Sequence, residues 1–425
     1  MSELNNEELS VLRDMEDHRY VSDDLLKAFC SGGLSEFRKF ILEKNKNIKK
    51  KHEKLAVLLR GNSDTIIVYQ NNHKIWELSV DKGKNCRVSF DFNHARFSDG
   101  WEGMLDELIH DWKFCLPTPR TTTEVLPTDK RIRIKRNSRN EVIGGSIGTI
   151  KCTKKEFDKD LVKRSYEIIT GFVTDFFKSQ NTDLFREAVR EDPTYNMQLK
   201  DVEGTGKGVL VEKRWQQRLL FHFDNMQNGY YAYDLEFSQK FPDSDYVKKY
   251  AKENGDRYAM VDAKEIKKKL GTNEPDILAI RYENAIPQSL VFIEVKSTYG
   301  ACDGDAGIAK HMKGMANYGK QPIFMNNRRK DAYLSLVQYQ TLGSIPEGIN
   351  IEPIDNNLPI EKVVLLTNSH VPKVEGGNIT PSACDYFKDN KEKIRKLADK
   401  YECDVWTTNS NYWEDDIAIN MTPFN

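Results

Sequence analysis

The amino-acid sequence predicts an α/β protein, in which an α+β N-terminal region precedes a mixed β-sheet that helices cover on both faces. Three observations support this fold class. The C-terminal half contains one helix and three strands, followed by strands that alternate with helices, an order typical of mixed sheets. The run Val363–Thr367 is almost entirely apolar, as in strands that are buried on both faces. The segment 65–92 alternates apolar and polar residues, as in half-buried antiparallel strands.

The N-terminal part mixes helical and strand-like segments. Residues 1–55 have mostly helical spacing, and Asn71-Asn72 between two alternating runs predicts a hairpin. Residues 117–148 are rich in Pro, Thr, Arg and Gly, and this composition predicts a linker or an extended arm. Two further helices are expected at 101–114 and 156–179.

The C-terminal part carries the elements that define the fold class. We expect strands at 230–237, 276–282, 290–296, 363–367 and, as the last strand, 405–408, and helices at 209–224, 305–318, 330–342 and 386–401. These elements divide the chain into an N-terminal α+β recognition or sensing domain (1–150), a helical connector (151–203) and a second α/β domain (204–425).

Composition excludes several classes of protein. Of the 425 residues, 39% are hydrophobic and 30% are charged, and no apolar run is long enough to span a bilayer, so we expect no membrane partner. The acidic N-terminus lacks the apolar region of a secretion signal, which predicts a cytoplasmic protein. The seven cysteines and eight histidines are scattered without a zinc-type spacing, which leaves carboxylates as the candidate metal ligands.

Positive charge is concentrated in two segments although the formal net charge is only −1. Lys44–Lys54 and Lys130–Arg139 are both strongly basic, and such clusters can follow a phosphate backbone. In the second cluster we take Arg133, Lys135 and Arg136 as candidate nucleic-acid contacts. A solvated helix face and an exposed loop are equally good interpretations of the two segments.

Two acidic residues and a lysine between Glu274 and Lys296 form the candidate site. Side chains alternate along a strand, so Glu294 and Lys296 project from the same face about 7 Å apart. In a hairpin centred on the connection before Leu290, Asp276 falls opposite Glu294 to within one residue. The alternative interpretation is that Asp276 caps a strand, and that Glu294 and Lys296 form an exposed ion pair.

Two carboxylates placed together at the end of an apolar hairpin repel each other, and low-dielectric surroundings strengthen the repulsion. A hard divalent cation such as Mg²⁺ or Mn²⁺ resolves this conflict, because both ions prefer oxygen ligands. A lysine beside the metal can hold an attacking water and stabilise charge on a phosphate. We therefore expect Asp276, Glu294 and Lys296 to be catalytic.

Pro275-Asp276 and Glu294-Val295-Lys296 resemble the motif of the PD-(D/E)XK nuclease superfamily. The resemblance covers the C-terminal half, from about 209 to 405. It implies a restriction-endonuclease-like core and Mg²⁺-dependent hydrolysis of phosphodiester bonds, with Mn²⁺ as a substitute. On this resemblance the metal ligands are Asp276, Glu294 and the backbone carbonyl of Val295.

Many members of that superfamily carry a further acidic residue before the first core strand. Glu212 is the candidate here, and Asp234 and Glu236 are alternatives. Lys310, His311 and Lys313 on the helix after the motif are expected near the mouth of the site, where they either contact substrate phosphates or lie in solvent.

The expected function is a metal-dependent DNA endonuclease, with DNA favoured over RNA, in a restriction or antiphage system. A homodimer or a partner protein of such a system is compatible with this function, because cutting a duplex needs two sites. The main alternative is a non-catalytic nucleic-acid-binding or assembly protein that retains the nuclease fold. A different metal-dependent hydrolase, such as a phosphatase, is a third interpretation.

Overall fold

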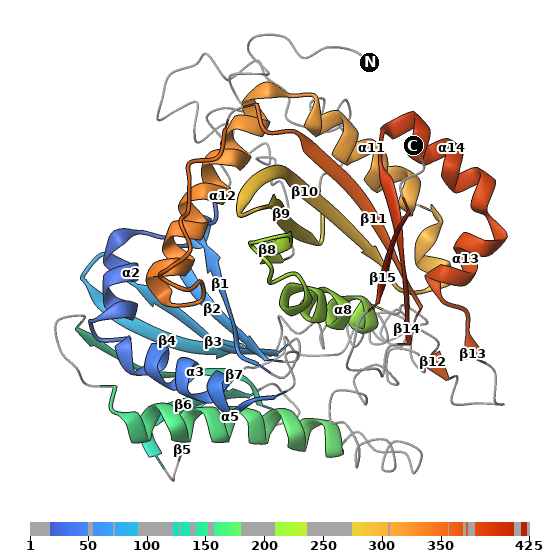
Figure 1. Ribbon diagram of the computed structural model, residues 1–425. Helices are drawn as coiled ribbons and strands as arrows, with labels where there is room; N and C mark the ends of the chain where they lie inside the picture. The colour runs from blue at the N-terminus through green and yellow to red at the C-terminus, as the bar shows by residue number, and fades with distance from the viewer. Residues whose placement is uncertain are drawn as a thin grey trace, which may run out of the picture.

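The structure is a computed structural model that describes most of the chain. The described residues are 18–49, 54–70, 73–91, 122–126, 129–136, 142–151, 157–179, 209–235, 274–304, 307–355, 357–368, 371–372, 379–411 and 418–422. Two large sheets, one in each half of the chain, organise these residues, and a third sheet has only two short strands (Figure 1). Within the described residues, no helix is both long and apolar enough to cross a membrane.

The N-terminal sheet has seven strands, and every neighbouring pair is antiparallel. Its strand order is β1-β2-β3-β4-β7-β6-β5. The strands are β1 (Ala56–Arg60), β2 (Thr65–Gln70), β3 (His73–Val80), β4 (Asn85–Asp91), β5 (Thr122–Leu126), β6 (Asp129–Arg136) and β7 (Val142–Lys151). The predicted hairpin is confirmed, because Gln70 pairs with His73 in the β2–β3 register.

Three helices cover one face of this sheet: α2 (Asp23–Cys30), α3 (Ser35–Asn47) and α5 (Lys159–Ser179). The ring of Trp76 on β3 lies 5.0 Å from that of Phe37, 5.7 Å from that of Phe40 and 6.1 Å from that of Tyr166. Aromatic rings at such spacings make favourable edge contacts in a core. The helix expected at 156–179 is thus confirmed, and it packs on the N-terminal sheet.

The linker expected at 117–148 is wrong, because β5, β6 and part of β7 occupy it. On β6, Ile132 and Ile134 are buried while Arg133 and Lys135 are exposed. The alternation is that of a half-buried strand, but only two apolar residues carry it. Gly145 on β7 permits the packing, since a Cβ atom there would lie 2.1 Å from the carbonyl oxygen of Arg133.

The C-terminal sheet is mixed, as the sequence predicts, with strand order β15-β14-β11-β10-β9-β8. The pairs β10–β11 and β11–β14 are parallel and the others are antiparallel. Its strands are β8 (Gly229–Leu235), β9 (Ile277–Glu283), β10 (Ile286–Lys296), β11 (Ile360–Asn368), β14 (Asp404–Asn411) and β15 (Ile419–Thr422). The expectation that β14 is the last strand is wrong, because β15 follows it and pairs with it.

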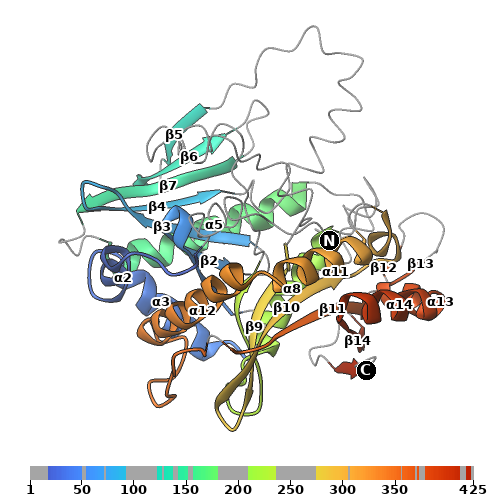
Figure 2. The ribbon, with the colours of Figure 1, turned by 90° about the horizontal axis from the view of Figure 1, so that it is seen from above.

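Helices cover both faces of this sheet (Figures 1 and 2). On one face, α8 (Val209–His222) buries Trp215 and Leu219 against alternate residues of β9 and β10. On the other face lie α11 (Ile308–Gly319) and α12 (Pro322–Leu342). The remaining elements are η2 (Gly61–Ser63), η5 (Tyr299–Cys302), β12 (Val371–Pro372), β13 (Ile379–Thr380), α13 (Ala383–Asp389) and α14 (Lys391–Tyr401).

The sequence predicts one continuous helix at 386–401, and this prediction is wrong because two helices occupy the segment. Asn390 has φ −120° and separates α13 from α14. A capping box, in which the side chains of Ser382 and Asp385 each accept from the other's backbone N–H, starts α13 earlier than the sequence predicts. Apolar spacing alone did not reveal this break.

Candidate active site

The β9–β10 hairpin brings the predicted site residues together. Asn284 and Ala285 form a two-residue turn with φ values of 51° and 64°, so both lie in the left-handed region that tight hairpin turns require. The pairing shifts by one residue between Pro287 and Ser289, a β-bulge. Beyond the bulge Ile277 pairs with Ile293, and the next step of this register places Asp276 opposite Glu294.

The bulge therefore decides on which face the carboxylates lie. Without the shift, the register that starts at the turn would place Asp276 opposite Ile293 rather than Glu294. The predicted facing of Asp276 and Glu294 is confirmed by the register, and the turn is shorter than the sequence predicted. Lys296 projects from the same face as Glu294, two residues further along β10.

Hydrogen bonds hold the carboxylate of Asp276 from two elements. Gln216 on α8 donates its side-chain N–H to Oδ1 at 2.6 Å, and the backbone N–H of Val295 donates to Oδ2 at 2.7 Å. Asp276 keeps part of its surface exposed. The helix and the strand that carries Glu294 thus fix its orientation, while part of the residue stays exposed to solvent.

Glu294 and Lys296 are buried, at 2% and 4% exposure. Lys296 Nζ lies 2.7 Å from Glu294 Oε1, and Nδ1 of His311 on α11 lies 3.1 Å from Glu294 Oε2. The interpretation of Glu294 and Lys296 as an exposed ion pair is therefore wrong. The sequence predicted His311 at the mouth of the site, whereas the structure places it against Glu294.

The charges at the site act on one another. Burial raises the pKa of Asp276 well above its ordinary value, and the charges of Glu294 and Glu212 raise it further. Burial also opposes ionisation of Glu294, but Lys296 and His311 outweigh burial and lower the pKa of Glu294. Burial opposes the charged form of Lys296 as well, but the three carboxylates raise the pKa of Lys296 above its ordinary value. Glu294 and Lys296 are thus held charged, and Asp276 is the carboxyl group that binds a proton first.

One buried oxygen suits a divalent cation at this site. Glu294 Oε2 is close to the ring of His311 but makes no hydrogen bond of good geometry, and a buried oxygen rarely lacks one. In the described part of the chain, no three side chains of His, Cys, Asp or Glu converge as a metal-binding group. Mg²⁺ does not require three, because it commonly takes one or two protein carboxylates and completes its shell with water and substrate oxygens. The Asp276–Glu294 pair therefore fits a hard divalent cation.

The other predicted ligand, Glu212, lies on α8 one helical turn before Gln216. Its charge reaches both Asp276 and Lys296, although it does not join Asp276 and Glu294 in a metal-binding group. The sequence pointed to Glu212 and missed Gln216. Their spacing of four residues on one helix face is a signal that could have found Gln216.

The predicted nucleic-acid contacts fall in two separate places. Lys310 and Lys313 are exposed on α11, beside the site. Arg133 and Lys135 are exposed on β6 of the N-terminal sheet, far from α11 in both views (Figures 1 and 2). Arg136 ends β6, and its side chain lies outside the described residues. The structure thus does not bring the two predicted groups together.

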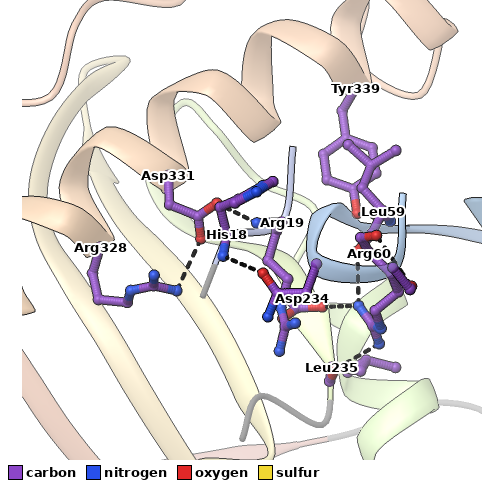
Figure 3. Close-up of polar contacts among 11 residues, drawn as sticks. His18, Arg19, Leu59, Arg60, Asp234, Leu235, Arg328, Asp331 and Tyr339 are labelled. Atoms are coloured by element: carbon purple, nitrogen blue, oxygen red, sulfur yellow. Dashed lines mark hydrogen bonds and ion pairs between the residues drawn. The ribbon is translucent and has the colours of Figure 1, made fainter. Parts of the chain in front are cut away.

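Asp234, an alternative to Glu212, belongs to a second buried charged cluster (Figure 3). Arg19 Nε lies 2.5 Å from Asp234 Oδ2, and Arg60 Nη1 binds Asp234 Oδ1. Arg60 also donates to the carbonyl oxygen of Leu235 at 2.8 Å. Because the charges of two arginines from the N-terminal half already balance the carboxylate of Asp234, Asp234 is not a metal ligand in this arrangement. Glu236 lies outside the described residues.

The same cluster extends onto α12. The backbone N–H of Arg19 donates to Asp331 Oδ1 at 2.5 Å, and Arg328 Nη1 donates to Asp331 Oδ2 at 3.1 Å. The side chain of Gln338 both donates to and accepts from the backbone of Val21, at 2.7 and 2.8 Å. The segment before α2 is thereby fixed to the C-terminal half of the molecule.

Comparisons with protein-family models, with curated proteins and with solved structures gave no match for this chain. The function is therefore inferred from the residues and geometry of the site.

Proposed function

We propose that this protein is a metal-dependent nuclease of the PD-(D/E)XK type, which hydrolyses phosphodiester bonds in DNA. One observation carries the proposal: Asp276 and Glu294 face each other across the β9–β10 hairpin, with Lys296 buried beside Glu294. Two carboxylates with a single ammonium leave negative charge in a largely buried site. A bound cation would neutralise that charge, and the substrate phosphate would complete its ligand shell.

Asp276, Glu294 and the backbone carbonyl of Val295 would hold Mg²⁺ or Mn²⁺. When bound, this ion supplies a Lewis acid that polarises the phosphate and lowers the pKa of water. Gln216 and the N–H of Val295 orient Asp276 for this task. Because neighbouring carboxylates raise the pKa of Lys296, its ammonium acts as a donor that positions water and stabilises phosphate charge, and not as a base.

The exposed Lys310 and Lys313 lie on the helix that carries His311 and are suited to contact substrate phosphates. Arg133 and Lys135 would contact nucleic acid only if the substrate also reached the N-terminal sheet. A role in restriction or antiphage defence in the cytoplasm, as a homodimer or with a partner protein, stays a prediction of the resemblance.

The test is cleavage of four substrates by the full chain: supercoiled plasmid, linear duplex DNA, single-stranded DNA and RNA, each with Mg²⁺, with Mn²⁺ and with EDTA. We expect metal-dependent cleavage of DNA. Glu294→Gln keeps the shape of the side chain and removes one metal-binding charge, so we expect the rate to fall about 1,000-fold or more, equivalent to about 4 kcal/mol of barrier.

Glu283→Gln is the matched control, because Glu283 is an exposed residue at the turn end of the same hairpin. It should cleave like the wild type. DNA binding without cleavage under every condition would favour the non-catalytic alternative. Full activity of Glu294→Gln would overturn the assigned site even if the protein is a nuclease.

A further inference from the structure

A cavity of about 440 Å³ lies between the two halves of the molecule, away from the proposed nuclease site. Residues of α3, β1, α8, β8 and the C-terminal end of α12 line it. Cavities of roughly 300–1,000 Å³ at the junction of two structural units are typical binding sites for small molecules. The proposed nuclease reaction does not use this cavity.

The apolar part of the lining forms what we call the floor of the cavity. Most of its side chains are aliphatic, and several are almost fully buried. These residues are Phe29, Ile41, Leu42, Leu55, Leu58 and Leu220. A ligand that enters the cavity therefore gains from the burial of an apolar portion, at about 25 cal/mol for each Å² removed from water.

Cations also line the cavity. Arg38, Lys46 and Lys54 contribute to the lining, and Asp224 adds one carboxylate. Arg38 donates to the carbonyl oxygens of Leu342 at 2.8 Å and Thr341 at 3.4 Å. Considering only described residues, no carboxylate forms an ion pair with Lys46 or Lys54. The cavity thus has an excess of positive charge beside an apolar floor.

A side chain joins the two segments that carry these lysines. Asn45, next to Lys46, donates to the carbonyl oxygen of Leu55 at 2.9 Å and accepts from its N–H at 2.8 Å. This pair of hydrogen bonds ties the end of α3 to the residue that follows Lys54. The basic segment Lys44–Lys54 noted in the sequence therefore places Lys46 and Lys54 in the wall of one cavity.

We propose that this cavity binds a small organic phosphate. Its phosphate group lies against Lys46 and Lys54, and its apolar body lies on the aliphatic floor. Phosphate is favoured over carboxylate because a doubly charged group matches several cations, and hydrogen bonds between charged groups are the strong ones. This site does not depend on the nuclease assignment, because it shares none of Asp276, Glu294 and Lys296.

The test is calorimetric titration of the full-length protein with octyl phosphate, adenosine monophosphate and inorganic phosphate. We expect at least one of the two organic phosphates to bind about tenfold or more tightly than inorganic phosphate, because only these occupy the floor. The better of the two identifies the body as aliphatic or as a planar base. In the double variant Lys46→Ala/Lys54→Ala we expect affinity to fall about tenfold or more.

The matched control is Lys39→Ala/Lys49→Ala, which removes two exposed lysines of the same region that do not line the cavity. It should bind like the wild type. Three results would overturn the proposal: no binding of either organic phosphate, equal affinity for inorganic phosphate, or unchanged affinity in Lys46→Ala/Lys54→Ala. Circular dichroism establishes that each variant is folded.

Discussion

Asp234 and Asp276 lie on the same face of the same sheet, on or beside neighbouring strands. The charges that surround the two carboxylates nevertheless differ in sign. In the β8–β9 register Asp234 pairs with Leu278, two residues from Asp276. Two guanidinium groups, from Arg19 and Arg60, surround Asp234. Asp276 instead faces Glu294, and among the described residues a single ammonium group, that of Lys296, pairs with Glu294.

This difference separates a carboxylate whose charge stabilises the fold from one whose charge the proposed metal ion would neutralise. A buried carboxylate with its countercharges in place is matched in the folded protein, and removing it leaves the partner charges unpaired. Burial and the facing Glu294 instead disfavour the charged form of Asp276, and groups with such raised pKa values are typical of functional sites. The comparison makes three predictions, which run from the largest expected effect on stability to the smallest.

Asp234→Asn removes the countercharge of two arginines, both of which are largely buried. We expect the free energy of unfolding to fall by about 3–5 kcal/mol, the usual cost of breaking a buried pair from one side. Urea unfolding followed by circular dichroism measures this change. The control is Asp24→Asn, since Asp24 is 62% exposed and forms an ion pair with exposed Lys84 at 3.7 Å. That change should cost less than about 1 kcal/mol. Equal effects of the two variants would contradict the structural role of Asp234.

Asp276→Asn should have the opposite sign. The pKa of Asp276 is raised in the folded protein, so the folded state holds the proton more tightly than the unfolded chain does. Stability from this group is therefore complete below about pH 4, the ordinary pKa of an aspartate, and is lost as pH rises toward the raised value. An asparagine side chain does not ionise, so this loss of stability disappears. Its carbonyl oxygen still accepts a hydrogen bond from the N–H of Val295. In the absence of metal we expect the variant to be about 1 kcal/mol more stable than the wild type at pH 8.

The gain should shrink as the pH is lowered toward 4, because Asp276 of the wild type then becomes protonated. Urea titrations at pH 4.5, 6 and 8 measure the trend. A variant that is less stable than the wild type at pH 8, or a difference in stability that does not depend on pH, would show that the surroundings of Asp276 do not disfavour its ionised form.

Millimolar Mg²⁺ should stabilise the wild type, because a cation that binds only the folded state shifts the unfolding equilibrium. At a concentration about threefold above Kd the gain is about 0.8 kcal/mol, a rise of about 1 °C in Tm for a chain of this length. Differential scanning calorimetry with Mg²⁺, against NaCl of equal ionic strength, measures it. Glu294→Gln should lose the response and Asp234→Asn should keep it. A response that survives in Glu294→Gln would place the cation elsewhere.

The sequence predicted the C-terminal sheet and the facing of Asp276 and Glu294 because the signals there are local. Apolar strands flank the hairpin, and Asp276 and Glu294 are only eighteen positions apart, so alternation and the turn nearly determine how they face. The register predicted from the sequence agrees with that of the structure to within one residue, and the bulge accounts for this difference. The burial of the Glu294–Lys296 pair did not follow from alternation, because α11 is what covers it with His311.

The features that the sequence missed depend on distant contacts or on weak patterns. Nothing near Arg19 indicates a partner 215 positions away at Asp234, and no local rule joins Arg60 to the same carboxylate. Strand β6 was not predicted, because its two buried isoleucines lie among arginines and lysines, a composition that resembles a basic loop. Tertiary packing, and not local propensity, determines such strands.

The β10 bulge also limits how the length of this hairpin can vary. The extra residue between Pro287 and Ser289 makes the chain between Asp276 and Glu294 one residue longer than the two-residue turn alone would require. If one residue were lost or gained in that stretch, a second irregularity would have to compensate for it. Otherwise the two carboxylates would move to opposite faces while the strands still paired. Sequences with the same site should therefore differ here through paired changes of length, one in the turn and one at the bulge.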